Sequence, residues 1–269
     1  MEIQRSIKIL IEKYKIFPSE KLGQNFLINS KALNYITEAI NPDKNKSYIE
    51  IGSGFLQLTN LVAERAKEVI AIEKDTRFKN FYREITSPNI KIIFADALDI
   101  DLSKFPINEV YGNIPYYISS QLIIRISHFM NVKRGVFLLQ KEYANRILSK
   151  KGSKDYGSIT VLVDFFFNKR YLRTFPSSFF YPKPTINSAL IELNRKEIDK
   201  NLDVQNFLAL LRTSFGMRRK KLFNNLKQKF KEEVIKEAML NAKIPLNSRA
   251  ENLDIDQYIN LYRKLFDEN

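Results

Sequence analysis

The chain has 269 residues, no cysteine, one histidine and a formal net charge of +14. These counts exclude disulfide scaffolds, thiolate metal sites and cysteine nucleophiles, and His128, at helical spacing among apolar residues, is predicted to be a packed helix residue. The excess of Lys and Arg favours a polyanionic partner, either a nucleic acid or an anionic membrane surface, although a solvated basic surface gives the same count.

Strands and helices alternate in the predicted pattern from residue 30 to residue 150. A helix at 31–40, capped by Ser30, precedes a buried strand at 47–54 that enters a glycine turn. Further strands are predicted at 68–75, 89–98, 109–116 and 134–140, and further helices at 56–67, 76–85, 118–129 and 141–150. This alternation is typical of a parallel, doubly wound sheet in an α/β fold.

The alternation ends after residue 150. Residues 159–175 and 188–196 are predicted to be two strands without an intervening helix, which would close the mostly parallel sheet with an antiparallel edge. Beyond a boundary near residue 197 the pattern is helical. The sequence therefore predicts a first domain at 1–196 and a small helical domain at 197–269.

The predicted strand ends carry residues suited to an adenosine-containing cofactor. Gly52 and Gly54 allow the backbone to approach a ligand closely, and a helix begins just beyond them. Glu73 ends the next strand, where a carboxylate can accept hydrogen bonds from both ribose hydroxyls, and Asp96 ends the third, where it suits an adenine amino group. Gln57 stands where a dinucleotide site would carry a third glycine, and the turn holds no Lys or Arg, so we expect a cofactor with little phosphate.

The segment Asn113-Ile114-Pro115-Tyr116 ends the fourth predicted strand beside the same crevice. The Asn113 amide oxygen and the Ile114 carbonyl would be two acceptors, held rigid by Pro115, for an exocyclic amine whose lone pair attacks an activated methyl group. Tyr116 offers a flat face on which a base taken out of its helix can stack. A structural Asn-Pro turn explains the same residues, and the cofactor signals favour the chemical interpretation: alkylation of an adenine amine without a strong base.

Longer segments of the chain follow a known family pattern, namely “KLGQNFL”, “NIPY”, “LLQKEYANRI” and “FPSSFFYPKPTINSALIEL”. With the glycine turn, Glu73 and Asp96, they resemble the S-adenosylmethionine-dependent rRNA adenine dimethyltransferases, which include the KsgA (RsmA) small-subunit enzymes and the Erm resistance enzymes. The resemblance covers nearly the whole chain. It implies an α/β, Rossmann-like S-adenosylmethionine-dependent methyltransferase with a mostly parallel, doubly wound sheet and a small C-terminal helical domain.

The resemblance implies a role for each matching residue. Cofactor contacts are expected from Asn25, Leu27, Gly52, Glu73, Asp96 and Asn113. Asn113 would also contact the target amine, and the rings of Tyr116 and Phe180 would stack on the flipped adenine. Two departures leave the catalytic groups in place: Leu56 stands where the family usually has a third glycine, which bears on cofactor affinity, and Tyr181 replaces the histidine of Phe-His-Pro.

The C-terminal segments “RTSFGMRRKKLFNNL” and “SRAENLDIDQYINLYRKL” resemble the KsgA branch, and Erm proteins usually lack both. Residues 212–231 carry basic side chains without an acid, and RNA phosphate contacts are expected from Arg218, Arg219, Lys220 and Lys221. The resemblance thus implies dimethylation of N6 in two adjacent adenosines of the hairpin loop near the 3′ end of 16S (small-subunit) rRNA. The alternatives are an Erm-like 23S rRNA methyltransferase and a non-enzymatic nucleic-acid-binding factor on the same fold.

The remaining expectations concern partners and location. No apolar run approaches the roughly 20 residues that span a bilayer, and the N-terminal segment lacks a cleavage site, so a cytoplasmic protein without a membrane partner is expected. The implied cofactor is S-adenosyl-L-methionine, and no metal is expected. The implied partner of this monomeric enzyme is the small ribosomal subunit precursor, with a role in ribosome biogenesis.

Overall fold

The computed structural model describes residues 2–85, 87–198 and 202–266. The chain forms two compact units: unit 1 comprises Met1–Ala144 and Arg170–Arg195, and unit 2 comprises Asn145–Lys169 and Lys196–Asn269. Each unit therefore draws on two separate stretches of the chain. The domain boundary expected near residue 197 stays a prediction.

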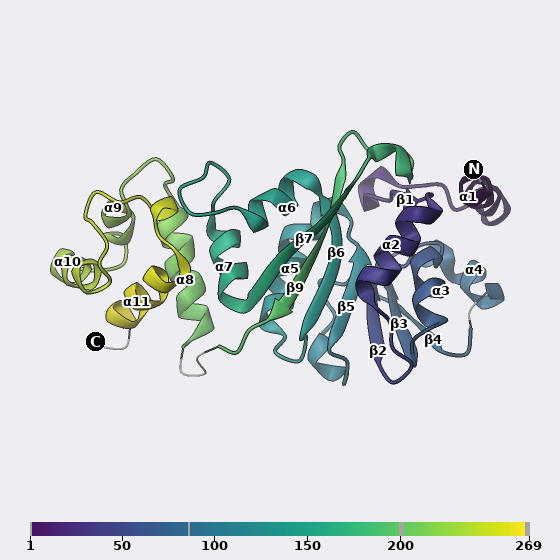
Figure 1. Ribbon diagram of the computed structural model, residues 1–269, viewed down its shortest axis with the longest axis horizontal. Coiled ribbons are helices and arrows are strands. Elements are labelled where there is room, and N and C mark those ends of the chain that lie inside the picture. Colours follow the sequence, from purple (N-terminus) through teal and green to yellow (C-terminus); the bar gives the residue numbers. More distant parts are fainter. Residues whose placement is uncertain (1, 86, 199–201, 267–269) are drawn as a thin grey trace. The chain divides into compact units, whose positions relative to one another are not determined.

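A mixed sheet organises unit 1 (Figure 1). In the described part of the chain it has seven strands in the order β4-β3-β2-β5-β6-β9-β7. Their bounds are β2 Ser47–Ile51, β3 Glu68–Glu73, β4 Ile90–Phe94, β5 Glu109–Asn113, β6 Arg134–Gln140, β7 Phe167–Phe175 and β9 Ser188–Arg195. Every pair from β4 to β6 is parallel, whereas β9 is antiparallel to β6. This order confirms the predicted mostly parallel, doubly wound sheet, because the chain moves outward from β2 in both directions.

Helices pack on the sheet through apolar stripes. Those before residue 150 are α1 Glu2–Tyr14, α2 Ser30–Ile40, α3 Gln57–Ala63, α4 Lys79–Ile85, α5 Ser119–His128 and α6 Lys141–Leu148. Leu33 of α2 and Val62 of α3 lie in one buried cluster with Tyr48 of β2 and Leu138 of β6. Burial of each such side chain contributes roughly 1.5–3 kcal/mol, so this cluster fixes α2 and α3 against the sheet. The N-cap of α2 is Asn29, whose side chain accepts from the Ala32 amide, and the predicted cap at Ser30 is wrong by one residue.

A second, two-stranded sheet joins the N-terminal segment to the Pro-rich segment. β1 (Phe26–Leu27) is antiparallel to β8 (Phe180–Tyr181), with Leu27 opposite Phe180. The Ile28 amide extends the pairing by donating to the Phe179 carbonyl at 2.8 Å. The segment expected to bind the cofactor and the loop expected to bind the target base are therefore held side by side.

The prediction of an uninterrupted strand at 159–175 is wrong. Residues Ser158–Phe166 form helix α7, and only Phe167–Phe175 form strand β7. Seven of the nine residues of α7 are buried, and only Ser158 and Asp164 are not. A short continuous apolar run with β-branched residues cannot be assigned by periodicity alone, and tertiary burial decided it.

Unit 2 is helical in its C-terminal stretch, as predicted. The helices there are α8 Val204–Phe215, α9 Leu222–Leu226, α10 Glu232–Asn241 and α11 Ile255–Phe266. The ring of Phe207 in α8 lies 4.6 Å from that of Phe165 in α7 and 5.9 Å from that of Tyr262 in α11, which joins both stretches in one core. None of the helices in the described residues has the length and apolar character required to cross a bilayer.

Candidate active site

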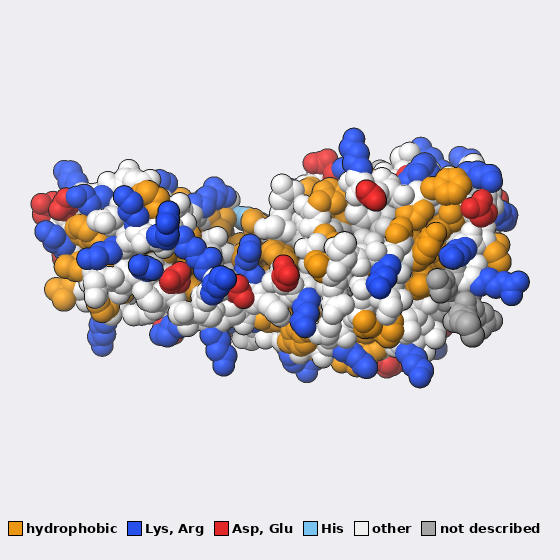
Figure 2. Space-filling view, turned by 90° about the horizontal axis from the view of Figure 1, so that it is seen from above, with side chains coloured by type: hydrophobic (Ala, Val, Ile, Leu, Met, Phe, Trp, Pro, Cys, Tyr) orange, Lys and Arg blue, Asp and Glu red, His pale blue; other side chains and the backbone are white. Residues whose placement is uncertain are grey.

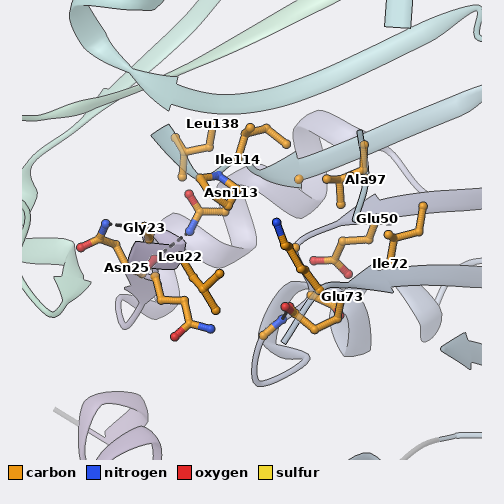
Figure 3. A pocket seen from close by; sticks show the side chains of 18 of the residues that line it. Leu22, Gly23, Asn25, Glu50, Ile72, Glu73, Ala97, Asn113, Ile114 and Leu138 are labelled. Carbon is orange, nitrogen blue, oxygen red and sulfur yellow. Dashed lines mark hydrogen bonds between the residues drawn. The ribbon is translucent and has the colours of Figure 1, made fainter. Parts of the chain in front are cut away.

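A pocket lies at the carboxyl ends of the central strands of unit 1. Figure 3 shows Asn25 and Asn113 toward one side of it and Glu50 and Glu73 toward the other. The lining includes all six predicted cofactor contacts, together with the predicted stacking residue Tyr116; the six are Asn25, Leu27, Gly52, Glu73, Asp96 and Asn113. Parallel strands bring their carboxyl ends to one edge of the sheet, which explains why residues so far apart in sequence meet here.

The glycine turn after β2 is a left-handed backbone segment. Gly52 and Gly54 have φ of +77° and +49°, and a Cβ on Gly54 would lie 3.1 Å from the Phe26 ring. Leu56 also lies in the left-handed region, with φ of 57° and a fully buried side chain. That conformation costs a non-glycine residue roughly 1–2 kcal/mol. The turn thus keeps the backbone path that glycine favours, although a leucine occupies the position.

Glu73 is the buried carboxylate of the pocket, with 8% of its surface exposed. It accepts hydrogen bonds from the backbone amides of Gly54 at 2.9 Å and Asp75 at 2.8 Å. Burial raises the pKa of Glu73, and the backbone amides of Asp75, Gly54 and Lys74 oppose that shift. A carboxylate has about four acceptor positions, so Glu73 keeps capacity for a further hydrogen bond.

Lys74 is a pocket residue that sequence analysis missed. Its Nζ lies 2.6 Å from Asp96 Oδ2, while the other Asp96 oxygen accepts from the Leu98 amide at 2.9 Å. Burial by itself would raise the pKa of Asp96, but Lys74 and the Leu98 amide outweigh it, so the pKa is lowered. In the sequence, the feature that could have identified Lys74 is its position directly after Glu73, at the end of a strand. An adenine amine at Asp96 would therefore have to share this carboxylate with the lysine ammonium or displace it.

The Asn113 side chain has a defined orientation. Its Nδ2 donates to the Asn25 carbonyl at 2.8 Å, and a carbonyl can only accept, so the amide oxygen is left as a free acceptor. The Ile114 amide donates to the Leu138 carbonyl at 3.1 Å, which fixes the turn to β6. Asn25 acts here through its backbone, while its own Nδ2 donates to the Gly23 carbonyl. The geometry thus provides an acceptor at the place expected from the sequence.

The two aromatic residues expected to stack on a base lie in different surroundings. Tyr116 is half-buried, lines the pocket and has its hydroxyl 2.9 Å from Ser188 Oγ. Burial raises the pKa of Tyr116, so the hydroxyl is neutral at physiological pH. Phe180 is only 2% exposed and belongs to the buried cluster that contains Leu27. The stacking role of Phe180 stays a prediction, because the structure does not bring its ring into the pocket lining.

The four predicted RNA-binding cations lie in unit 2, between α8 and α9. Arg218, Arg219, Lys220 and Lys221 are exposed and line a groove with Lys236, Arg249 and other residues. Arg218 differs from the other three because it forms an ion pair with Glu251, at 3.3 Å. The sequence, with no acid near these cations, offered no sign of that pair.

His128 ends α5, where Nδ1 lies 2.8 Å from the Ile124 carbonyl, and it does not line the pocket. Among the described residues no group of His, Asp and Glu could hold a metal ion. The described lining of the pocket offers amides, carboxylates, the Lys74 ammonium and aromatic rings.

Glu50 is a second buried acid that sequence analysis did not single out. It lies in β2 just before the glycine turn, lines the pocket and accepts from the Tyr111 hydroxyl at 3.1 Å. Burial raises its pKa from 4.5 to about 8, and the neighbouring Glu73 adds to the shift. The signal in the sequence was an acid inside an apolar strand.

We expect Glu50→Gln to make the free energy of unfolding less dependent on pH between about 4.5 and 8. Over this window the folded protein keeps the Glu50 proton while the unfolded chain releases it, so wild-type stability falls as pH rises and the glutamine removes that loss. Urea unfolding at several pH values measures the effect, with exposed Glu38→Gln as control. Parallel pH profiles for Glu50→Gln and the wild type would show that Glu50 is ionised in the folded protein.

Comparisons with known proteins agree with this geometry. Residues 18–267 match the family described as ribosomal RNA adenine dimethylase. Ribosomal RNA small subunit methyltransferase A of Anoxybacillus flavithermus is 35% identical, over 96% of this chain and 94% of its own, and that of Mesoplasma florum is 34% identical, over 93% and 99%.

Solved structures give the same result for the fold. A dimethyladenosine transferase from Plasmodium falciparum has a TM-score of 0.73 and 27% identity, over 87% of this chain and 94% of that one. The 23S rRNA methyltransferase ErmE has a TM-score of 0.69 and 23% identity, over 90% and 99%, a likeness that supports the fold alone.

Proposed function

The chain belongs to the ribosomal RNA adenine dimethylase family and is an S-adenosylmethionine-dependent rRNA adenine dimethyltransferase; we propose that it dimethylates N6 of two adjacent adenosines in the hairpin loop near the 3′ end of small-subunit rRNA. The observation that carries this proposal is the oriented Asn113 amide, whose oxygen is free to accept from an exocyclic amine. Relatives named for the small subunit support that substrate over the Erm-like and non-enzymatic alternatives.

The pocket residues fit an adenosine-containing methyl donor. Glu73 and Asp96 supply acceptors at adjacent strand ends for ribose hydroxyls and an adenine amine, and Ile72 and Ala97 supply apolar surface between them. The glycine turn has no cation for a phosphate, which suits a nucleoside rather than a nucleotide. Asn25, Leu27 and Gly52 would complete the site on the side of Asn113.

Methyl transfer requires the N6 lone pair to leave conjugation with the adenine ring. In the first methyl transfer the Asn113 oxygen and the Ile114 carbonyl would accept both N6 hydrogens, which takes the lone pair out of conjugation with the ring. In the second transfer N6 carries one methyl and one hydrogen, and one of the two acceptors would hold that hydrogen. Tyr116 stacks on the base and fixes its position. When bound, S-adenosylmethionine would supply a sulfonium methyl group: the N6–CH3 bond forms as the S–CH3 bond breaks, and neutral S-adenosylhomocysteine leaves. The nitrogen that has gained a methyl is strongly acidic and releases its proton to water, so the residues need to provide orientation rather than a base.

The basic surface of unit 2 would hold the structured RNA through its phosphates. In this proposal the protein acts as a monomer in the cytoplasm, and its partner is the small ribosomal subunit precursor. The role is therefore in small-subunit biogenesis.

The test incubates the purified protein and labelled S-adenosylmethionine separately with unmethylated small subunits and with large-subunit rRNA. Nuclease digestion and mass spectrometry then map the product. Dimethyladenosine at two adjacent positions of the small subunit is expected. Label confined to large-subunit RNA would assign the chain to the Erm branch, and RNA binding without label would favour a non-enzymatic factor.

A further inference from the structure

We propose that the loop between α6 and α7, residues 149–157, is a second phosphate-contacting element for RNA, and that Arg218 is the residue that positions it. This segment is called the lysine loop below. The inference rests on the proposed function, because the partner is the same RNA. It assigns to Arg218 a role different from that of the cations beside it.

The Arg218 guanidinium forms hydrogen bonds within unit 2. Its Nε lies 3.3 Å from Glu251 Oε2, and its Nη2 donates to the backbone carbonyls of Lys154 and, at 3.2 Å, of Tyr156. Arginine presents its donors in a rigid planar fork, so one side chain can hold two carbonyls and a carboxylate at once. The Arg218 donors that face the lysine loop are therefore occupied and not directed at a phosphate.

Further contacts fasten the lysine loop to the same region of unit 2. The Gly152 amide donates to the Glu251 carbonyl at 2.7 Å, and Lys151 forms an ion pair with Asp254 at 2.5 Å. Tyr156, only 2% exposed, donates its hydroxyl to the Leu253 carbonyl at 2.8 Å. The backbone of the loop is thus held at Gly152, Lys154 and Tyr156, and the exposed side chains of Lys150 and Lys154 extend from this anchored backbone.

The lysine loop presents free cations next to those already predicted to bind RNA. Lys150 and Lys154 are exposed, and neither forms an ion pair with a described residue. The loop also carries one acid, the exposed Asp155. The groove beside Arg218 is lined by further cations and, among the described residues, by no acid; these cations are Arg219, Lys220, Lys221, Lys236 and Arg249.

The positive charge of this surface favours a polyanion as the partner. Lys and Arg side chains are numerous over α8–α11 on the face shown in Figure 2. Cations on both sides of Arg218 form one basic surface that suits a phosphate backbone, whose negative charges are closely and regularly spaced. Because Arg218 touches the loop backbone at Lys154 and also lines the groove, it connects the two parts.

The test measures binding of a fluorescent small-subunit rRNA fragment by anisotropy over a range of salt concentrations. Lys150→Ala/Lys154→Ala is expected to reduce the salt slope by about 2, and Arg219→Ala by about 1. Arg218→Ala should reduce RNA affinity and the salt slope as much as the loop double variant does. When Arg218→Ala is added to that double variant, affinity should not fall further, whereas adding Arg219→Ala should lower it again.

Lysine substitutions separate geometry from charge. Arg219→Lys should bind RNA like the wild type, since a point charge suffices for phosphate, whereas Arg218→Lys should be as defective as Arg218→Ala. Trypsin should cleave the lysine loop faster in Arg218→Ala than in Arg219→Ala at equal thermal stability. An additive effect of Arg218→Ala in the loop variant, or full binding by Arg218→Lys, would overturn the inference. Failure of the wild type to bind the fragment would instead contradict the proposed function.

Discussion

Asn113→Ala is expected to lower kcat for methyl transfer about 10²- to 10³-fold while RNA affinity stays near the wild-type value. The variant removes the oriented oxygen that accepts from N6, and the alanine leaves the Asn25 carbonyl without its donor at 2.8 Å. An interaction made mainly as the lone pair turns toward the methyl group affects kcat rather than binding. Single-turnover assays with small subunits, together with anisotropy on the rRNA fragment, measure both quantities.

Ser119→Ala is the matched control for Asn113→Ala. Ser119 lies at the end of the same turn, where its hydroxyl donates to the Pro115 carbonyl at 3.2 Å, but it does not line the pocket. Its loss should leave kcat within a few-fold of the wild type. If Asn113→Ala lost RNA binding and methyl transfer in equal measure, Asn113 would be a structural residue of the turn.

Tyr116→Ala is expected to lower kcat/KM for the RNA substrate roughly 10- to 100-fold, because stacking of a base on an aromatic ring contributes about 1–3 kcal/mol. Tyr116→Phe keeps the ring and loses only the hydrogen bond to Ser188, so its kcat/KM should remain within a few-fold of the wild type. Steady-state assays at varied substrate concentration compare the two.

Ser188→Ala breaks the Tyr116–Ser188 hydrogen bond from the other side and serves as the control. It should behave like Tyr116→Phe. If Tyr116→Phe and Ser188→Ala were both as defective as Tyr116→Ala, the hydroxyl would be the functional group and the stacking interpretation would be wrong. Such a result would also make the buried ring of Phe180 the remaining candidate for stacking.

Much of the site could be predicted because its residues follow strand ends. Glu73 and Asn113 each end a strand that the apolar pattern made visible, Asp96 lies two residues beyond the end of β4 at Phe94, and parallel strands place such ends at one edge of a sheet. The family resemblance then supplied a role for each residue. These inferences need only the local pattern of apolar and polar residues and the general rule that parallel strands end at one edge of a sheet.

Other features depended on contacts between distant residues. The Asn113 amide is oriented by a carbonyl 88 residues away, and Lys74 reaches an acid 22 residues away. Phe180 is buried beside Leu27 through the β1–β8 pairing, a contact that the sequence did not indicate, and its stacking role stays a prediction. Side-chain direction at such positions is set by neighbours that local sequence does not identify.

The sequence by itself determined the alternating strands and helices, the polar strand ends and the basic C-terminal segment, since periodicity and charge are local properties of a chain. Only the tertiary structure decided that residues 158–166 form a helix, because a short, mostly apolar run with β-branched residues fits a buried strand as well as a buried helix. It also separated Arg218 from the neighbouring cations by pairing it with Glu251, 33 residues further on. A run of like charges shows that a surface is basic, but only folding determines which of its members are paired.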